Sequence, residues 1–234
     1  MIINTNAIVL KTFSYGETSL ISRCFTENRG KISFIIKGAK AKKNLIAPYF
    51  QPLSYINIIF NENEKRELQI VSKVSFVKIW TKIPLSLKKM TLSQSVLEIS
   101  DFTLEKNDPY PNLFKILIKT FLYFENDDFD ENIVFWHYEC KILSEMGFLI
   151  DIEDDQEFMQ GSFRLKKTDS SFLVLQNLIK GNLSRKDIGN LSKKENKDVS
   201  QFLYYKLCYH FEGFERIKSF QVIKDIFYNV VGDI

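Results

Sequence analysis

The hydrophobic period changes near Pro84, and this change constrains the fold more than any other feature of the sequence. Before Pro84, short apolar runs that alternate with polar residues are separated by turn residues, a pattern typical of β-strands. After it, apolar residues recur about every 3.6 positions, the period of an amphipathic helix. The sequence therefore predicts a two-domain α+β chain, with strands in residues 1–80 and an all-helical domain in residues 81–234.

The first 80 residues contain five or six strand-like runs with no helix between them. The expected strands cover 6–10, 20–25, 32–36, 53–60, 67–72 and 74–80, and the polar stretch 61–64 reads as a hairpin turn. Short strands at this spacing indicate a small closed barrel.

The helical part carries four strong apolar stripes. They run from Leu92 to Phe102, from Leu113 to Leu122, from Phe135 to Met146 and from Val199 to Phe214. A shorter helix is expected over 171–180, and a small hairpin over 158–165. No apolar run reaches 18 residues, so we expect no membrane span. With no secretion signal at the N-terminus and three dispersed cysteines (Cys24, Cys140 and Cys208), we expect a reducing cytoplasm.

Charge is divided unevenly between the two parts. Residues 1–80 hold 12 Lys and Arg against 5 Asp and Glu, whereas the remainder holds 20 against 24. The cations concentrate in residues 23–43, which contain Arg23, Arg29, Lys31, Lys37, Lys40, Lys42 and Lys43 and only one acid. Such point charges suit sequence-independent contact with phosphates. Alternatively, the lysines protect a strand edge from aggregation. By alternation, Ile32, Phe34 and Ile36 face the barrel core, so Lys31 and Lys37 lie on the opposite side and are expected to be free for phosphate.

Barrels that bind single strands usually add aromatic side chains on which bases stack. Tyr15, Tyr49 and Tyr55 are the candidates for this role. Packing in the core or at the rim of the barrel is the alternative for each of them. No side chain suggests base-specific hydrogen bonding, so we expect binding that tolerates any sequence.

Other chemistries find little support in the sequence. The acidic stretches 127–131 and 153–155 are consecutive in loops, whereas a two-metal site needs carboxylates that converge from several elements. His137 and Cys140 have the spacing of a ligand pair, but no third or fourth ligand accompanies them. Gly38-Ala39-Lys40 lacks the spacing of a nucleotide-binding loop. We therefore expect a protein without catalytic residues, metal or cofactor.

Four N-terminal motifs together resemble the opening of the RecO family. They are Thr5-x-Ala7-Ile8-Val9-Leu10, Tyr15-Gly16-Glu17-Thr18-Ser19-Leu20-Ile21, Phe25-Thr26-x-x-x-Gly30-Lys31 and Lys37-Gly38-Ala39-Lys40. Looser similarity follows in Pro52-Leu53, in Tyr138 to Phe148 and in Tyr209 to Phe220. The resemblance implies an N-terminal oligonucleotide-binding (OB) barrel followed by helices. Many members carry two Cys-x-x-Cys pairs that bind zinc, but residues 149–173 contain no cysteine, so the zinc site is not expected here.

The resemblance also implies a function and partners. RecO proteins are recombination mediators in bacterial DNA repair that bind single- and double-stranded DNA and anneal complementary strands. With a RecR partner they help to load recombinase onto strands coated by single-strand-binding protein, whose acidic tail the family engages. Lys206, Arg216 and Lys218 lie close in sequence to Tyr204, Tyr205 and Tyr209 and are our hypothetical site for that tail.

Two rival functions remain open. The first is a protein-interaction adaptor whose barrel binds no nucleic acid. The second is an RNA-binding barrel, because recognition of the 2′-hydroxyl depends on geometry that a sequence does not reveal.

Overall fold

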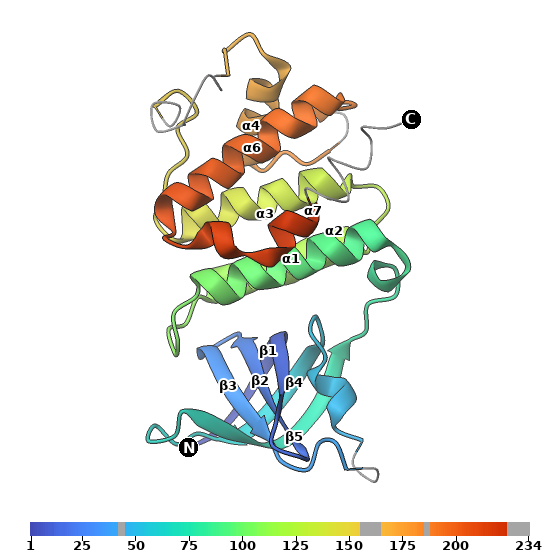
Figure 1. Cartoon of the computed structure of the whole chain (residues 1–234), viewed down its shortest axis with the longest axis vertical. Coiled ribbons are helices and arrows are strands. Elements are labelled where there is room, and N and C mark those ends of the chain that lie inside the picture. The colour runs from blue at the N-terminus through green and yellow to red at the C-terminus, as the bar shows by residue number, and fades with distance from the viewer. Residues whose placement is uncertain (42–44, 155–164, 185–187, 224–234) are drawn as a thin grey trace. The chain divides into compact units, whose positions relative to one another are not determined.

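The computed structural model describes residues 1–41, 45–154, 165–184 and 188–223. Five strands and one short 3-10 helix come first along the chain (Figure 1). Their bounds are β1 Ile2–Tyr15, β2 Ser19–Thr26, β3 Gly30–Ile36, η1 Ala47–Phe50, β4 Tyr55–Asn61 and β5 Leu68–Lys78.

The five strands form a closed barrel in the order β1-β2-β3-β5-β4. All neighbours are antiparallel except β3 and β5, which pair in parallel over residues 33–35 and 68–70. This is the five-stranded arrangement of the OB fold, and it confirms the predicted barrel and the hairpin turn between β4 and β5.

The two strands predicted for 67–72 and 74–80 are a single strand, β5. Opposite β4, Phe60 pairs with Val71 and Ile59 with Lys73, so Ser72 is an extra residue in the ladder. Such a β-bulge shifts the alternation of side chains by one position. The interrupted hydrophobic alternation at Ser72 is therefore the signature of the bulge and not of a turn.

Alternate residues of every strand point into the barrel and form its core. Phe34 and Phe60 meet there edge to face, with ring centroids 5.1 Å apart. The buried members are Ile3, Ala7, Val9, Leu20, Cys24, Ile32, Phe34, Ile36, Ala39, Phe50, Ile56, Ile58 and Phe60. Partly buried residues of η1 and its flank, Ile46, Ala47 and Tyr49, pack against this core.

Helices follow from Leu87, close to the predicted change of period at Pro84. Their bounds are α1 Leu87–Thr103, α2 Pro111–Phe124, α3 Glu131–Glu145, α4 Ser170–Lys180, α6 Lys193–His210 and α7 Lys218–Ile223, with 3-10 turns η2 Ile83–Leu85 and η4 Phe214–Arg216. The hairpin predicted over 158–165 falls almost wholly outside the described residues. None of the described helices is long and apolar enough to cross a membrane.

Local sequence explains where several helices begin and end. Asp130 accepts hydrogen bonds from the first backbone amides of α3, and Ser192 and Glu195 form a capping box at α6. The last predicted helix ends earlier than expected, at His210, and Phe214 lies in η4. The helix stops because Phe211, its C-cap, is extended, and Gly213, with a φ of 81°, is then the N-cap of η4.

The described residues form two compact units. The barrel unit contains residues 1–81 and also 93–115, which come from α1 and α2. The helical unit contains residues 82–92 and the chain from 116 onward. The helical sequence from 93 to 115 is thus part of the compact unit that contains the barrel.

Within the helical unit, α3 is buried continuously from Ile133 to Cys140, and this run includes the acidic Glu139. Neither carboxylate oxygen of Glu139 has a hydrogen-bond partner among the described residues. Burial raises the pKa of Glu139 well above its usual value, because a charge is costly to remove from water.

We expect Glu139→Gln to stabilise the protein increasingly as the pH rises. The unfolded chain ionises Glu139 above about pH 4.5, whereas burial keeps the proton bound to a higher pH in the folded chain, so this group favours unfolding as the pH rises. Denaturant unfolding at pH 5 and pH 7 should show an advantage of the variant that grows with pH, by at most about 1.4 kcal/mol per pH unit. Glu145→Gln, an exposed position of the same helix, is the control. Equal pH dependence of Glu139→Gln and wild type would contradict a buried, protonated carboxyl.

Candidate nucleic-acid interface

The cations predicted to bind phosphate have different surroundings. Lys37 and Lys40 are exposed. Lys42 and Lys43 lie outside the described residues. Arg23, Arg29 and Lys31 all contact acids: Arg29 Nε is 3.2 Å from Glu62 Oε1, and the other two contact Asp101.

Lys31 is not available to phosphate as the sequence predicted. Its side chain points outward from the barrel, but only 8% of it is exposed. Its Nζ donates a hydrogen bond of 2.5 Å to the backbone carbonyl of Asp101 and lies 3.8 Å from Oδ1 of that residue. Burial is the main cause that lowers the pKa of Lys31, and the charge of Asp101 opposes it. The alternation was predicted correctly, but residues 93–115 cover this position.

Residues 101–114 cover one end of the outer face of β2 and β3. Phe25 packs edge to face on Phe114 with centroids 5.4 Å apart. The amide of Asn107 donates to the carbonyl of Lys31 at 3.1 Å. In an OB fold the outer face of strands 2 and 3 is where oligonucleotides usually bind. Residues 101–114 therefore close one half of that face to a ligand.

The other half of the face carries an apolar row across four strands. Phe13 pairs with Ile21, Ile21 with Ile35 and Ile35 with Ile70. The two ends of the row are open to solvent, since Phe13 is 40% and Ile70 37% exposed, whereas Ile21 between them is buried. Phe13 was not among the predicted stacking residues, although its spacing of two residues from Lys11 and from Tyr15 places all three on the same face of β1.

Cations and a second aromatic ring flank this row. Tyr15, 52% exposed, pairs with Ser19 at the end of β2. Lys37 follows the last residue of β3, and the amide of Lys40 donates to the carbonyl of Thr18 at 2.9 Å. On the other side of the row, exposed Lys11 pairs with Arg23. We call these residues the open face: Lys11, Phe13, Tyr15, Ile21, Arg23, Ile35, Lys37, Lys40 and Ile70.

Two of the three predicted stacking residues take part in packing within the barrel unit. Tyr49 stacks on Phe76 with ring centroids 4.4 Å apart. Tyr55 is half-buried, lies parallel to Trp80 at 6.3 Å, and has its pKa raised by burial and by Glu27. Of the three candidates, Tyr15 is the one on the open face.

Among the described residues, no group of three or more His, Cys, Asp and Glu side chains could hold a metal ion. His137 and Cys140 are buried in α3, and burial lowers the pKa of His137 to about 4. Asp127, one of the loop acids, contacts the ammonium groups of Lys82 at 2.5 Å and of Lys89 at 2.6 Å. These hydrogen bonds lower the pKa of Asp127 to about 2, which fits a structural ion pair.

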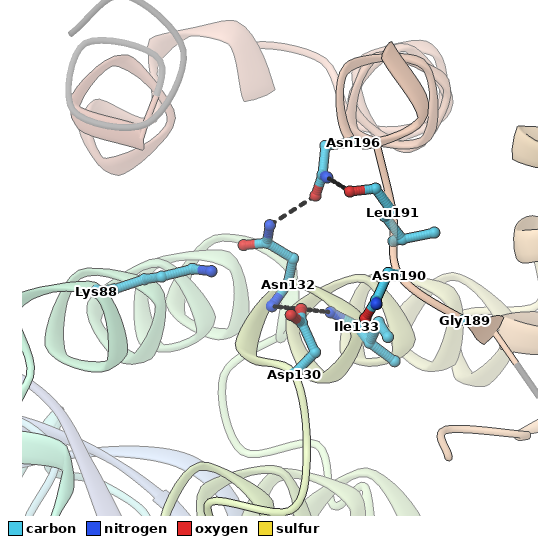
Figure 2. Close-up of a pocket in the computed structure, with 8 residues that line it drawn as sticks. All are labelled: Lys88, Asp130, Asn132, Ile133, Gly189, Asn190, Leu191 and Asn196. Carbon is cyan, nitrogen blue, oxygen red and sulfur yellow. Dashed lines mark hydrogen bonds between the residues drawn. The ribbon is translucent and has the colours of Figure 1, made fainter. Parts of the chain in front are cut away.

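The helical unit also contains a polar pocket of about 310 Å³, shown in Figure 2. The side chain of Asn132 donates to Asn196 at 2.8 Å, and Asn196 donates in turn to the carbonyl of Leu191 at 3.4 Å. Asp130 accepts from the amides of Asn132 and Ile133, as expected for a residue that caps α3. Because these polar groups satisfy one another, they hold the loop to the helix and do not point to a ligand.

The residues suggested for an acidic tail are not equally accessible. Lys206 is buried in α6, with 7% exposed, so its side chain offers little surface to a partner. Arg216 and Lys218 are exposed, and Arg216 Nε lies 3.7 Å from Glu215. Tyr204 packs near Phe214 and Phe220, whereas Tyr209 is 56% exposed.

Comparison with known proteins agrees with this architecture. The model of the recombination protein O N-terminal family matches residues 1–80, and that of the corresponding C-terminal family matches residues 84–157. The DNA repair protein RecO of Flavobacterium psychrophilum is 26% identical over 97% of this chain and 100% of its own length. That of Bacillus pumilus is 26% identical over 74% of this chain and 67% of its own length.

The RecO protein of Salinibacter ruber is 32% identical over 50% of this chain, and the match spans 45% of its own length. The two family models follow each other along the chain as the barrel and the first helices do, and together they cover more than half of it. The chain therefore belongs to the RecO family.

Proposed function

We propose that the protein is a DNA-binding recombination mediator that anneals complementary strands during DNA repair. The observation that carries the proposal is the open face, where exposed Phe13 and Ile70 lie between Lys11 on one side and Tyr15, Lys37 and Lys40 on the other. The names of its relatives, DNA repair protein RecO, support the assignment to repair.

Each component of the open face has a physical role in this function. Phe13 and Tyr15 offer rings on which bases of any type stack, and the lysines contact phosphates. Two complementary strands repel each other through their phosphates, and a cationic surface screens this repulsion. Annealing needs no bond to be made or broken, so we propose a protein that is not an enzyme and that acts at bacterial DNA undergoing repair.

The proposed partners follow from the family. They are single- and double-stranded DNA, a RecR-type protein that helps to load recombinase, and the acidic tail of single-strand-binding protein. Exposed Arg216 and Lys218 are the remaining candidates for contact with that tail, because an acidic segment binds to cations that are accessible on the surface.

Changing Lys37, Lys40, Lys42 and Lys43 together to alanine tests the proposal. Affinity for single-stranded DNA should fall, and the log–log slope of affinity against salt should become shallower by about 0.7 for each lost phosphate contact. Fluorescence anisotropy of a labelled strand at several salt concentrations measures both quantities.

The matched control removes four exposed lysines of the helical unit, Lys180, Lys193, Lys194 and Lys197. It changes the net charge equally but should leave the salt slope nearly unchanged. Equal effects of the two quadruple variants would mean that overall charge, and not the barrel, determines binding.

The apolar row favours a second candidate function, a barrel that docks a protein. In that case the purified protein would show no salt-dependent affinity for DNA at all. An RNA-binding barrel would instead bind a matched RNA strand more tightly than the DNA strand in competition.

A further inference from the structure

Asp101 lies two residues before the end of α1, inside the barrel unit, and it contacts two cations of the barrel. Arg23 Nη1 donates to both of its carboxylate oxygens, at 2.9 and 2.8 Å. Lys31 Nζ reaches its backbone carbonyl at 2.5 Å. The carboxylate thus neutralises cations that the sequence assigned to phosphate binding.

The position of Asp101, near the C-terminal end of α1, does not favour an acidic residue. The C-terminal end of a helix carries partial negative charge and favours cations. Lys31 stabilises this end of α1, because its ammonium group donates a hydrogen bond to a backbone carbonyl near the terminus. The guanidinium group of Arg23 instead hydrogen-bonds the carboxylate of Asp101. Lys31 therefore has a structural role, whereas the contact of Arg23 is of a kind that another anion could replace.

Arg23 is also placed where a ligand could reach it. Its side chain is 32% exposed, against 14% for Asp101 and 8% for Lys31. It pairs with exposed Lys11 on β1 and lies two residues from Ile21 in the apolar row. Carboxylate and phosphate present similar oxygens to a guanidinium group.

We propose that Asp101 is an internal substitute for a DNA phosphate at Arg23 and withholds one phosphate contact from the open face. The inference rests on the proposed function, because it concerns the strength of DNA binding at the same face. A strand on the open face competes with Asp101 for Arg23, and binding is weaker than the number of cations on the face would allow.

The Asp101→Asn variant tests this inference by salt-dependent anisotropy with a single strand. Its affinity should rise roughly threefold, the size expected for one partly exposed ion pair. Its log–log salt slope should become steeper by about 0.7, the amount for one additional phosphate contact. Adding Arg23→Gln should remove both gains.

Glu105→Gln is the matched control, since it removes the same charge from an exposed residue four positions further along the chain. An unchanged slope in Asp101→Asn, or a gain that survives Arg23→Gln, would overturn the inference. If Asp101→Asn does not fold, the Arg23→Gln variant alone tests the inference. Its log–log salt slope should then be close to that of the wild type, and a slope shallower by about 0.7 would contradict the inference. Absence of DNA binding by the wild-type protein would instead refute the proposed function.

Discussion

Replacing Gly30 by alanine is expected to destabilise the barrel unit by about 3 kcal/mol or more, at the severe end of single substitutions. Gly30 has a φ of 66°, which disfavours any side chain. A Cβ at this position would lie 2.0 Å from the carbonyl oxygen of Asp108 and 2.5 Å from its carbonyl carbon. Both atoms belong to backbone, so neither can rotate away as a flexible side chain would. Denaturant unfolding of the purified variant measures the loss.

Comparison with the Gly16→Ala variant distinguishes the two causes of this loss, the left-handed backbone and the clash with Asp108. The φ of Gly16 is 57°, close to that of Gly30, but a Cβ there would meet no atom within 4 Å. Gly16→Ala should therefore cost only about 1 kcal/mol, the strain of the left-handed backbone. Equal losses in the two variants would mean that residues 93–115 do not approach Gly30 as closely as described.

Replacing Phe13 and Tyr15 together by alanine is expected to lower the affinity for single-stranded DNA on the order of a hundredfold. Stacking contributes about 1–3 kcal/mol per base, and both rings are exposed on one face of β1. Neither side chain carries charge, so the salt slope should remain that of the wild type. Loss of affinity at constant slope is the signature that distinguishes stacking from phosphate contact.

The control for this variant is Tyr209→Ala, which removes a ring of similar exposure from the helical unit. It should bind DNA as the wild type does. A wild-type affinity in the Phe13 and Tyr15 variant would exclude the apolar row from the DNA site. A parallel loss of salt slope would instead indicate that the variant disturbs the positions of Lys37 and Lys40.

The barrel and the helices could be predicted because their signals are local. Alternation along a strand decides which side chains enter the core, and the prediction that Ile32, Phe34 and Ile36 face inward is confirmed. The change of period near Pro84 likewise reports the onset of helices. The bulge at Ser72 left the predicted number of strands open at five or six, since one extra residue breaks the alternation just as a turn does.

The sequence by itself determined which residues point outward from the barrel, while the tertiary structure alone decided which of them meet solvent. Lys31 and Lys37 alternate outward as predicted, and so does Arg23 on β2. Lys37 is exposed, whereas Asp101 contacts Arg23 and Lys31 from 78 and 70 residues away. Alternation is a property of neighbouring residues, but burial and ion pairing depend on segments that only folding brings together. The same reason explains why Tyr15 is exposed while Tyr55 packs beside Trp80.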